Sequence, residues 1–318
     1  MKKIMEECSG AKRIAISGHI RPDGDCVGAC MGMYLYLKKE LPEAEIVVYL
    51  EKTADIFQCI KDIDVIKDPA LDQNAEPYDV FIVLDSVPER TGAAEAIYNR
   101  AVKTINIDHH ISNTGAGMVN YIVPTASSAS ELVYDVIDTG KMDVDIATAI
   151  YIGIVHDTGV FQYSNTAPKT LQIAAELIRF GFDFSKIIEE TFYQKTFIQN
   201  QILGRAVMES ELFLDGKCVY SVVNKDIMEL YGVKSSDMSG IINQLRNTKG
   251  VECAVFMYEL EPETYKVSMR SAGTVDVSKV AEYFGGGGHV KASGFTLQGT
   301  SKEVLEKLTA QIEKQLIK

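Results

Sequence analysis

The sequence predicts an α/β protein with an N-terminal parallel sheet flanked by helices and a smaller α/β domain after it. In the first half of the chain, short β-branched runs alternate with helical patterns, which is typical of βαβ units. The 318 residues are 46% hydrophobic and 24% charged, which is an ordinary globular composition. This length is sufficient for two domains of usual size.

The first half is expected to supply four strands to one sheet. These strands are RIAISGH (13–19), AEIVVYL (44–50), YDVFIVLDS (78–86) and KTINIDHH (103–110). Ser128 should begin a helix, because Glu131 follows it with the spacing of a capping box. The other expected helices cover 26–39, 145–156 and 168–180.

A helical segment at 185–205 is polar on one face and is expected to connect two domains. We therefore place the first domain at 1–188, a connecting helix at 189–208 and the second domain at 209–318. The second domain should combine strands and helices. The strands are KCVYSVV (217–223), VECAVFMYEL (251–260) and YKVSMRS (265–271), and the helices are VDVSKVAEYF (275–284) and SKEVLEKLTAQIEKQL (301–316).

Charge and hydropathy restrict the partners. The formal charge of −12 leaves no broad basic surface for a long nucleic acid, so a nucleic-acid partner should be short and held locally. The N-terminal MKKIMEECSG carries charges before an apolar core could form, and no run approaches the roughly 18 apolar residues of a membrane span. We expect a cytoplasmic protein with no membrane partner. The six cysteines form no CxxC pair and should be reduced, mostly buried thiols, although Cys26 and Cys30 could share a helix face as a metal or redox pair.

Acidic residues and histidines gather after the predicted strands. All five histidines lie beside Asp or Gly clusters. The carboxyl ends of parallel strands meet at one sheet edge, where ligands bind. Four carboxylates there would repel one another unless cations lay between them, and two divalent ions would balance their charge. Mixed His and Asp ligands favour Mn²⁺ over Mg²⁺. The five candidates for these four carboxylates are Asp23, Asp25, Asp85, Asp108 and Asp157.

Each motif also has a structural interpretation. PDGD alone is commonly a turn, and Asp85 alone could cap a helix or lie in a loop. Their joint occurrence at successive strand ends favours a metal site, because independent turns have no reason to share His and Asp content.

The motifs GHIRPDGD (18–25), VLDS (83–86), IDHH (107–110), GIVHDTGVF (153–161) and GGGGH (285–289) occur in this order over nearly the whole chain. This series resembles the DHH/DHHA1 phosphoesterase family, and within it the nanoRNase and pAp phosphatase branch. The resemblance implies a two-ion site. One ion would take His19, Asp23 and Asp85, and the other Asp25, Asp85, His109 and Asp157.

The resemblance also implies catalytic roles for Asp85, for His110 as a substrate contact and for Asp108 as a residue that orients the imidazoles. His156 departs from the family pattern, so we expect an outer contact or a core position for it and no ligand role. In this family the two divalent ions are usually Mn²⁺. Two ions about 4 Å apart can share a water, lower its pKa and direct hydroxide at phosphorus.

The second domain is expected to bind substrate. Arg270 ends a predicted strand, and four consecutive glycines (285–288) could present backbone N–H groups to an anion, although such a run can also be a hinge after a helix. The resemblance places the active site in a cleft between an N-terminal DHH domain and a C-terminal DHHA1 domain. It implies substrate binding by Arg270, Ser271, Gly286, Gly287, Gly288 and His289.

The expected function is manganese-dependent hydrolysis of short oligoribonucleotides (nanoRNA) to mononucleotides and of pAp to AMP. The resemblance also implies a homodimer, which no feature of the sequence itself shows. The sequence does not separate this activity from that of a cyclic-dinucleotide or pApA phosphodiesterase. A family II inorganic pyrophosphatase would need more Lys and Arg than the segments MRSAGTV (269–275) and GGGGHVKASG (285–294) supply. A RecJ-like exonuclease would need a further nucleic-acid-binding module. A non-catalytic nucleotide sensor is disfavoured by the intact His and Asp set.

Overall fold

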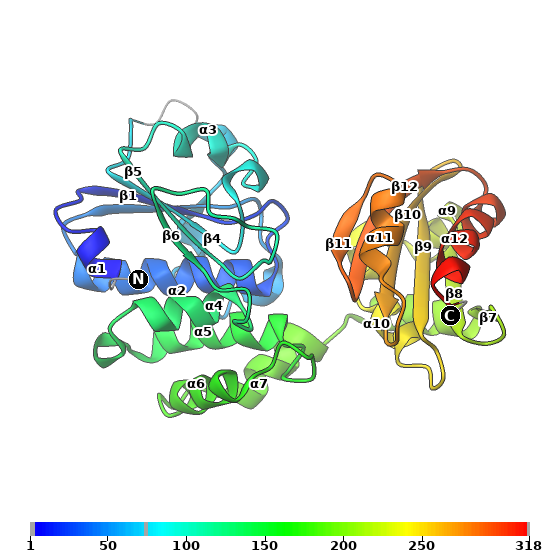
Figure 1. Ribbon diagram of the computed structural model, residues 1–318. Coiled ribbons are helices and arrows are strands. Elements are labelled where there is room, and N and C mark those ends of the chain that lie inside the picture. The colour runs from blue at the N-terminus through cyan, green and yellow to red at the C-terminus, as the bar shows by residue number, and fades with distance from the viewer. Residues whose placement is uncertain (1–3, 73–75, 317–318) are drawn as a thin grey trace. The chain divides into compact units, whose positions relative to one another are not determined.

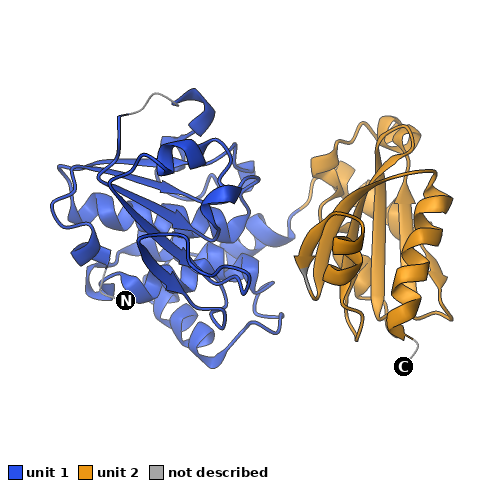
Figure 2. Cartoon of the chain, turned by 45° about the horizontal axis from the view of Figure 1, so that its top comes forward, with its two compact units in different colours: residues 1–194 blue, residues 195–318 orange. Residues whose placement is uncertain are grey.

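The chain folds into two compact units, residues 1–194 and 195–318 (Figure 2). The computed structural model describes residues 4–72 and 76–316, except for the side chain of His289. The division between the units falls inside the segment expected to connect two domains. That segment consists of α7 (Phe184–Ile188), a π-helical turn η6 (Glu189–Tyr193) and α8 (Phe197–Met208).

Unit 1 is built on a six-stranded parallel sheet with the order β3-β2-β1-β4-β5-β6. The four strands expected from the sequence are β1, β2, β4 and β5. The two additional strands lie at the edges, where β3 has only two residues and β6 is partly exposed, so neither has a strong sequence pattern. The strands are β1 (Arg13–Ser17), β2 (Glu45–Tyr49), β3 (Ile66–Lys67), β4 (Val80–Leu84), β5 (Lys103–Asp108) and β6 (Val119–Ile122).

Helices cover both faces of this sheet (Figure 1). Helices α2, α4 and α5 pack on one face of the sheet, and Ile14 and Ile16 of β1 point towards them. Ala15 of the same strand points to the other face, where it packs in a second core with α3. β4 is buried along its whole length, as expected for a central parallel strand. The helices of unit 1 are α1 (Ile4–Glu7), α2 (Gly24–Glu40), α3 (Ala94–Tyr98), α4 (Ala129–Val136), α5 (Val144–Asp157), α6 (Pro168–Ile178) and α7.

Helices α2 and α5 pack against each other very closely. A Cβ atom on Gly28 of α2 would lie 2.6 Å from the carbonyl oxygen of Ala149 in α5. The next glycine towards the N-terminus of α2, Gly24, faces His156 near the C-terminus of α5. The two helices are therefore antiparallel, and their packing brings the start of α2 beside the end of α5.

Side chains cap the two helices whose first turns lie at the site, α2 and α4, and only the cap of α4 was predicted from the sequence. Asp23 is the N-cap of α2, and its Oδ1 accepts hydrogen bonds from the backbone N–H groups of Asp25 and Cys26. Ser128 is the N-cap of α4 and accepts from the N–H of Glu131, as the capping-box spacing predicts. The carboxylate of Glu131 accepts from the hydroxyls of Ser127 and Thr170 instead, since both lie within hydrogen-bond distance of it.

Unit 2 contains a mixed six-stranded sheet with the order β11-β12-β10-β9-β8-β7, in which only β8 and β9 pair in parallel. The three predicted strands are β8, β9 and β10, and the two predicted helices are α11 and α12. The strands are β7 (Glu211–Phe213), β8 (Cys218–Val223), β9 (Cys253–Glu261), β10 (Thr264–Ser271), β11 (Gly287–His289) and β12 (Ala292–Gln298). The helices are α8, α9 (Lys225–Tyr231), α10 (Ile241–Arg246), α11 (Val277–Tyr283) and α12 (Ser301–Leu316).

The six cysteines are free thiols, and Cys59 is the exposed one. In the described part of the chain, no helix is both long enough and apolar enough to cross a membrane.

Candidate metal centre and substrate site

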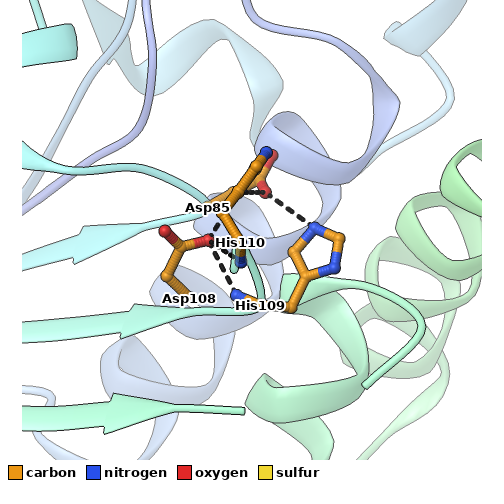
Figure 3. Close-up of side chains that lie close together, drawn as sticks. All are labelled: Asp85, Asp108, His109 and His110. Carbon is orange, nitrogen blue, oxygen red and sulfur yellow. Dashed lines mark hydrogen bonds and ion pairs between the residues drawn. The ribbon is translucent and has the colours of Figure 1, made fainter. Parts of the chain in front are cut away.

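The sheet of unit 1 brings the predicted acidic and imidazole groups to one edge. Because β1, β4 and β5 are parallel, the segments that follow them leave at the same edge. His19 follows β1, Asp85 follows β4, and Asp108 ends β5 directly before His109. Figure 3 shows Asp85, Asp108, His109 and His110 gathered at this edge. Residues that lie far apart in the sequence therefore share one site.

Asp85 lies between two imidazoles. Its Oδ2 is 3.3 Å from Nε2 of His19, and its Oδ1 is 3.3 Å from Nε2 of His109. The side chain is buried, and Oδ1 has no hydrogen-bond partner among the described residues. Asp85 also has a φ of 56°, in the left-handed region that Asp tolerates better than most residues. Each carboxylate oxygen thus faces a different imidazole.

His19 presents its Nε2 atom to carboxylates. Its Nδ1 lies 2.9 Å from the carbonyl oxygen of Ile20, which can only accept, so Nδ1 carries the hydrogen. The Nε2 atom then faces Asp85 and Oδ1 of Asp23, at 3.6 Å. Burial lowers the pKa of His19, but Asp23 and Asp85 raise it more, to about 12. Asp23 is more exposed than the other acidic groups, and its pKa is lowered to about 2 because His19 outweighs the effect of burial.

His109 has three carboxylates around its Nε2 atom. The distances are 3.3 Å to Asp85, 3.7 Å to Oδ2 of Asp157 and 3.8 Å to Oδ2 of Asp25. Burial lowers the pKa of His109, but Asp85, Asp25 and Asp157 raise it more, to about 10. Burial, followed by the charge of Asp85, raises the pKa of Asp157 to about 7. The space between these groups therefore favours positive charge.

Asp25 is held by the start of helix α4. The N–H of Ala129 donates to its Oδ2 at 2.6 Å, and the N–H of Ser130 donates to its Oδ1 at 2.9 Å. These are the first two residues of α4, so the partial positive charge of a helix N-terminus also faces the carboxylate. Burial and the charges of Asp85 and Asp157 still raise the pKa of Asp25 well above its usual value.

Asp108 is fixed by hydrogen bonds and orients His110. Its Oδ1 accepts from the N–H groups of His109 and His110 and lies 2.7 Å from Nδ1 of His110 (Figure 3). Its Oδ2 accepts from the amide of Asn113 at 2.7 Å, and Asn113 also donates to Asn106. Because an ionised carboxylate only accepts, Nδ1 of His110 carries the hydrogen and Nε2 points elsewhere. The predicted contact between Asp108 and an imidazole is present.

Several of these supporting residues were not found from the sequence. Asn106 is a polar amide between the two isoleucines of β5, and that was an available signal. No sequence signal identified Asn113 or the N-terminus of α4 as supporting groups, because their roles depend on contacts that are made only in the folded chain. Asn165 is a further example, since its amide reaches the carboxylate of Asp157.

His156 lies in a packed environment beside the metal centre. Its ring makes edge contacts with Phe57 and Phe192, at centroid distances of 5.3 and 5.5 Å. Its Nε2 is 3.0 Å from the hydroxyl of Thr191, which donates to Ile187 and is therefore left to accept from His156. Burial lowers the pKa of His156 to about 4, so the ring is neutral at pH 7. The same ring lines a pocket of about 80 Å³ together with Asp23, Gly24, Asp25 and Asp157.

The donor set of this edge fits divalent cations. A buried carboxylate oxygen without a hydrogen-bond partner among the described residues, on Asp85, is the atom that a cation would satisfy. Within residues 4–72 and 76–316, three groups of side chains have candidate ligand atoms within 4.8 Å of one another. They are Asp85, Asp108, His109 and His110; His19, Cys26 and Asp85; and Asp25, His109 and Asp157. Cys26 thus places a buried sulfur beside His19.

In unit 2, the sheet places Arg270 in the same row as His289, which directly follows the glycine run. Arg270 of β10 pairs with Ala292 of β12, and Ala292 pairs with His289 of β11. The side chain of His289 lies outside the described part of the structure. Ser271 is buried, and its hydroxyl lies 3.4 Å from the carbonyl oxygen of Gly273.

The glycine run is a turn followed by an edge strand. Gly285 has a φ of 77°, and Gly287 and Gly288 pair with β12. A side chain at Gly286 would overlap Phe295, and one at Gly288 would overlap the backbone of Ala292. Packing therefore explains two of the four glycines, while Gly285 and Gly287 face open space.

A parallel α/β sheet whose carboxyl edge gathers aspartates and histidines around a cation-favouring space is typical of hydrolases that use metal ions. Residues 13–154 match the DHH family N-terminal domain, and residues 215–318 match the DHHA1 domain. The chain belongs to the DHH/DHHA1 phosphoesterase family, and it is a hydrolase of phosphoester bonds.

Named relatives match over most of the chain. The bifunctional oligoribonuclease and PAP phosphatase NrnA of Thermus thermophilus is 28% identical over 288 residues, which is 90% of this chain and 84% of the relative. The protein of the same name from Bacillus subtilis is 27% identical over 308 residues, which is 94% of this chain and 93% of the relative. Among solved structures, an exopolyphosphatase-related protein from Bacteroides fragilis has a TM-score of 0.91 and 25% identity, covering 98% of this chain and 94% of that one. The predicted family, fold class and enzyme class are confirmed.

Proposed function

We propose that this enzyme hydrolyses short oligoribonucleotides to mononucleotides and pAp to AMP, with two Mn²⁺ ions in the metal centre of unit 1. The observation that carries this proposal is the position of Asp85, whose buried oxygens face His19 and His109 separately. The substrate class is supported by the relatives, which are named as oligoribonucleases and PAP phosphatases.

Two sets of donors would hold the ions. His19, Asp23 and Asp85 would form one site, and Asp25, Asp85, His109 and Asp157 the other, with Asp85 shared between them. Both imidazoles offer Nε2 to the centre, and nitrogen donors mixed with carboxylates suit Mn²⁺ better than Mg²⁺. When bound, such a pair of ions lowers the pKa of a water and stabilises the charge that develops on phosphoryl oxygens.

His110 would contact the scissile phosphate or the leaving group. Its Nδ1–H is held by Asp108, so the ring orientation is fixed, and Nε2 is the ring atom that would meet the substrate. Asp108 cannot move freely, because Asn113 and two backbone N–H groups hold its carboxylate. The pair would therefore hold a proton donor or acceptor at one position, ready to assist the departing oxygen.

Unit 2 would supply positive charge for the rest of the nucleotide. Four Asp⁻ and two divalent ions are neutral overall, so the metal centre alone gives little attraction for an anionic substrate. Arg270 and the neighbouring glycine strand, with Gly286, Gly287, Gly288, Ser271 and His289, are the proposed binding surface. The charge of −12 agrees with a short single-stranded RNA or a small nucleotide as the ligand. We also propose a homodimer, which light scattering of the purified protein would test.

A parallel assay of four substrates tests the function. The purified enzyme with Mn²⁺ should release mononucleotides from RNA of two to five nucleotides and AMP from pAp. It should turn over pApA and pyrophosphate more slowly. The same assays with Mg²⁺ in place of Mn²⁺ serve as a comparison. Release from neither RNA nor pAp, while metal is bound, would refute the assignment, and preferred turnover of pApA would replace it with a phosphodiesterase.

A further inference from the structure

The chain turns sharply after Asp157, and the turn is left-handed. Gly159, Val160 and Phe161 have φ values of 56°, 57° and 63°. Val160 is β-branched, so this conformation is a true outlier for it and persists only where the surrounding structure imposes it. The hydroxyl of Thr158 accepts from the N–H of Phe161 at 3.0 Å, and the carbonyl of Thr158 accepts from the N–H of Tyr163 at 2.9 Å. The turn therefore sends the chain back towards the end of α5.

The residue that returns to the site is Asn165. Its side-chain amide lies 2.8 Å from the carbonyl oxygen of Ser127, 3.1 Å from the carbonyl oxygen of Asp157 and 3.2 Å from Oδ2 of Asp157. All three neighbours are acceptors, so the orientation of the amide is set by chemistry, with its nitrogen towards them. Oδ2 of Asp157 is also the oxygen that faces His109.

The opposite side of this amide group is left without a partner. Oδ1 of Asn165 is buried and has no hydrogen-bond partner within the residues that the structure describes. A buried acceptor without a donor costs stability, so the arrangement is not one that stability alone would favour. A strained turn and an unsatisfied acceptor both accompany the contact between Asn165 and Asp157.

The second contact of Asn165 connects Asp157 to Asp25. Ser127 directly precedes the N-cap of α4, and the first two amides of α4 hold the carboxylate of Asp25. By bonding both Ser127 and Asp157, one amide group ties together the segments that support two carboxylates. Those carboxylates face the same imidazole nitrogen, at 3.7 and 3.8 Å.

We propose that Asn165 is a positioning residue that fixes the spacing of Asp157 and Asp25 and thereby sets the affinity of the ion held by Asp25, Asp85, His109 and Asp157. This inference rests on the proposed function and deepens it. The ion held by His19 and Asp23 depends on other contacts, so Asn165 acts on one ion of the pair. Residues that support metal ligands through hydrogen bonds change metal affinity by about 10- to 100-fold when they are replaced.

Calorimetric titration of the metal-free enzyme with Mn²⁺ tests this inference. In Asn165→Ala, one of the two binding steps should weaken at least about tenfold, while the other stays within about twofold of the wild-type value. Asn165→Asp keeps the shape and places a carboxylate against Oδ2 of Asp157, so it should weaken the same step further. Asn165→Asp also tests the inference if the alanine variant does not fold.

Thr166→Val is the matched control, because the neighbouring Thr166 hydroxyl is buried without a hydrogen-bond partner within the described residues. Both of its binding steps should match the wild type. Activity provides a second readout. Excess Mn²⁺ should restore most of the kcat of Asn165→Ala, and KM for pAp should stay unchanged, because substrate contacts are intact.

The outcomes separate the inference from the proposed function. If the wild-type enzyme binds two ions and hydrolyses pAp, but Asn165→Ala and Asn165→Asp bind both ions normally, the inference is wrong and the function stands. Equal weakening of both steps would also overturn it, since that result indicates general loosening of the site. If the wild-type enzyme binds no divalent ion, the proposed function fails, and the inference fails with it.

Discussion

The two units treat buried polar groups differently. Unit 1 buries four carboxylates, those of Asp25, Asp85, Asp108 and Glu131, whereas the buried polar side chains described in unit 2 are those of Ser221, Ser271 and Ser293. Burying a charge is unfavourable unless it is paired or binds a metal. Unit 1 therefore accepts an unfavourable arrangement where chemistry needs fixed charges. Among the described residues of unit 2, the ionised groups stay closer to solvent.

Sheet topology explains how this difference arises. In unit 1 the strands are parallel, so segments that follow different strands converge at one edge. In unit 2 only β8 and β9 are parallel, and neighbouring strands end at opposite edges. Arg270 and the glycine strand are instead brought together as a row across the sheet. The parallel sheet of unit 1 therefore gathers charged groups at one edge, whereas the mixed sheet of unit 2 places residues side by side across its strands.

The largest expected effect comes from removing the shared carboxylate of unit 1. Asp85→Asn should lose metal and lower kcat at least about 10²-fold, because both sets of donors include Asp85. Assays of pAp hydrolysis and metal content measure this. Asp79→Asn is the control at the other end of the same strand, where Asp79 accepts from the N–H groups of Lys12 and Arg13, and it should keep its activity. Normal metal content in Asp85→Asn would refute the shared role.

Metal removal should affect the stability of unit 1 more than that of unit 2. At a free Mn²⁺ concentration of 100 times Kd, binding to the folded state adds about 2.7 kcal/mol. For a unit of this size, that corresponds to a rise of roughly 5–10 °C in Tm. Calorimetric melting with Mn²⁺ and with a chelator should show one transition that shifts and one that does not. Equal shifts in both would mean that unit 2 also binds metal.

Loss of Arg270 should act on substrate binding. Arg270→Ala should raise KM for pAp by about tenfold or more, since a hydrogen bond to a charged group contributes about 1.5–3 kcal/mol. Turnover of an activated aryl phosphodiester, which has no nucleotide to hold, should change little. Lys266→Ala, on the same strand, controls for the loss of one positive charge. Equal loss on both substrates would contradict the division of roles between the units.

Thiol reactivity gives the smallest effect. The exposed Cys59 of unit 1 should react with a thiol reagent in the native enzyme, and the five buried thiols of both units only after unfolding. Burial raises the pKa of Cys59 above its usual value and that of Cys8 to about 12. Because the thiolate is the reactive form, the rate at Cys59 should rise between pH 7 and pH 9. Counting the thiols that react checks this.

Much of unit 1 was predictable because its signals are local. The short runs rich in β-branched residues in β1, β4 and β5 identify strands. Asp85 and His109 directly follow β4 and β5, so parallel pairing alone predicts that they meet. Asn113 and Asn165 could not be found in this way, because their contacts depend on loop paths. The glycine run was expected to bind an anion, yet close packing on Phe295 already explains Gly286. The arrangement of the two units as a cleft stays a prediction.

The support of Asp25 by backbone amides has an evolutionary consequence. Ala129 and Ser130 hold this carboxylate through N–H groups that every residue except proline possesses. The two contacts to Asp25 therefore do not depend on the side chain at either position, although both residues are fully buried. Proline at position 129 would ordinarily be welcome as the first residue of a helix. Here proline would remove the N–H that donates to Oδ2 of Asp25. A substitution that is compatible with the start of a helix would therefore weaken the support of this carboxylate.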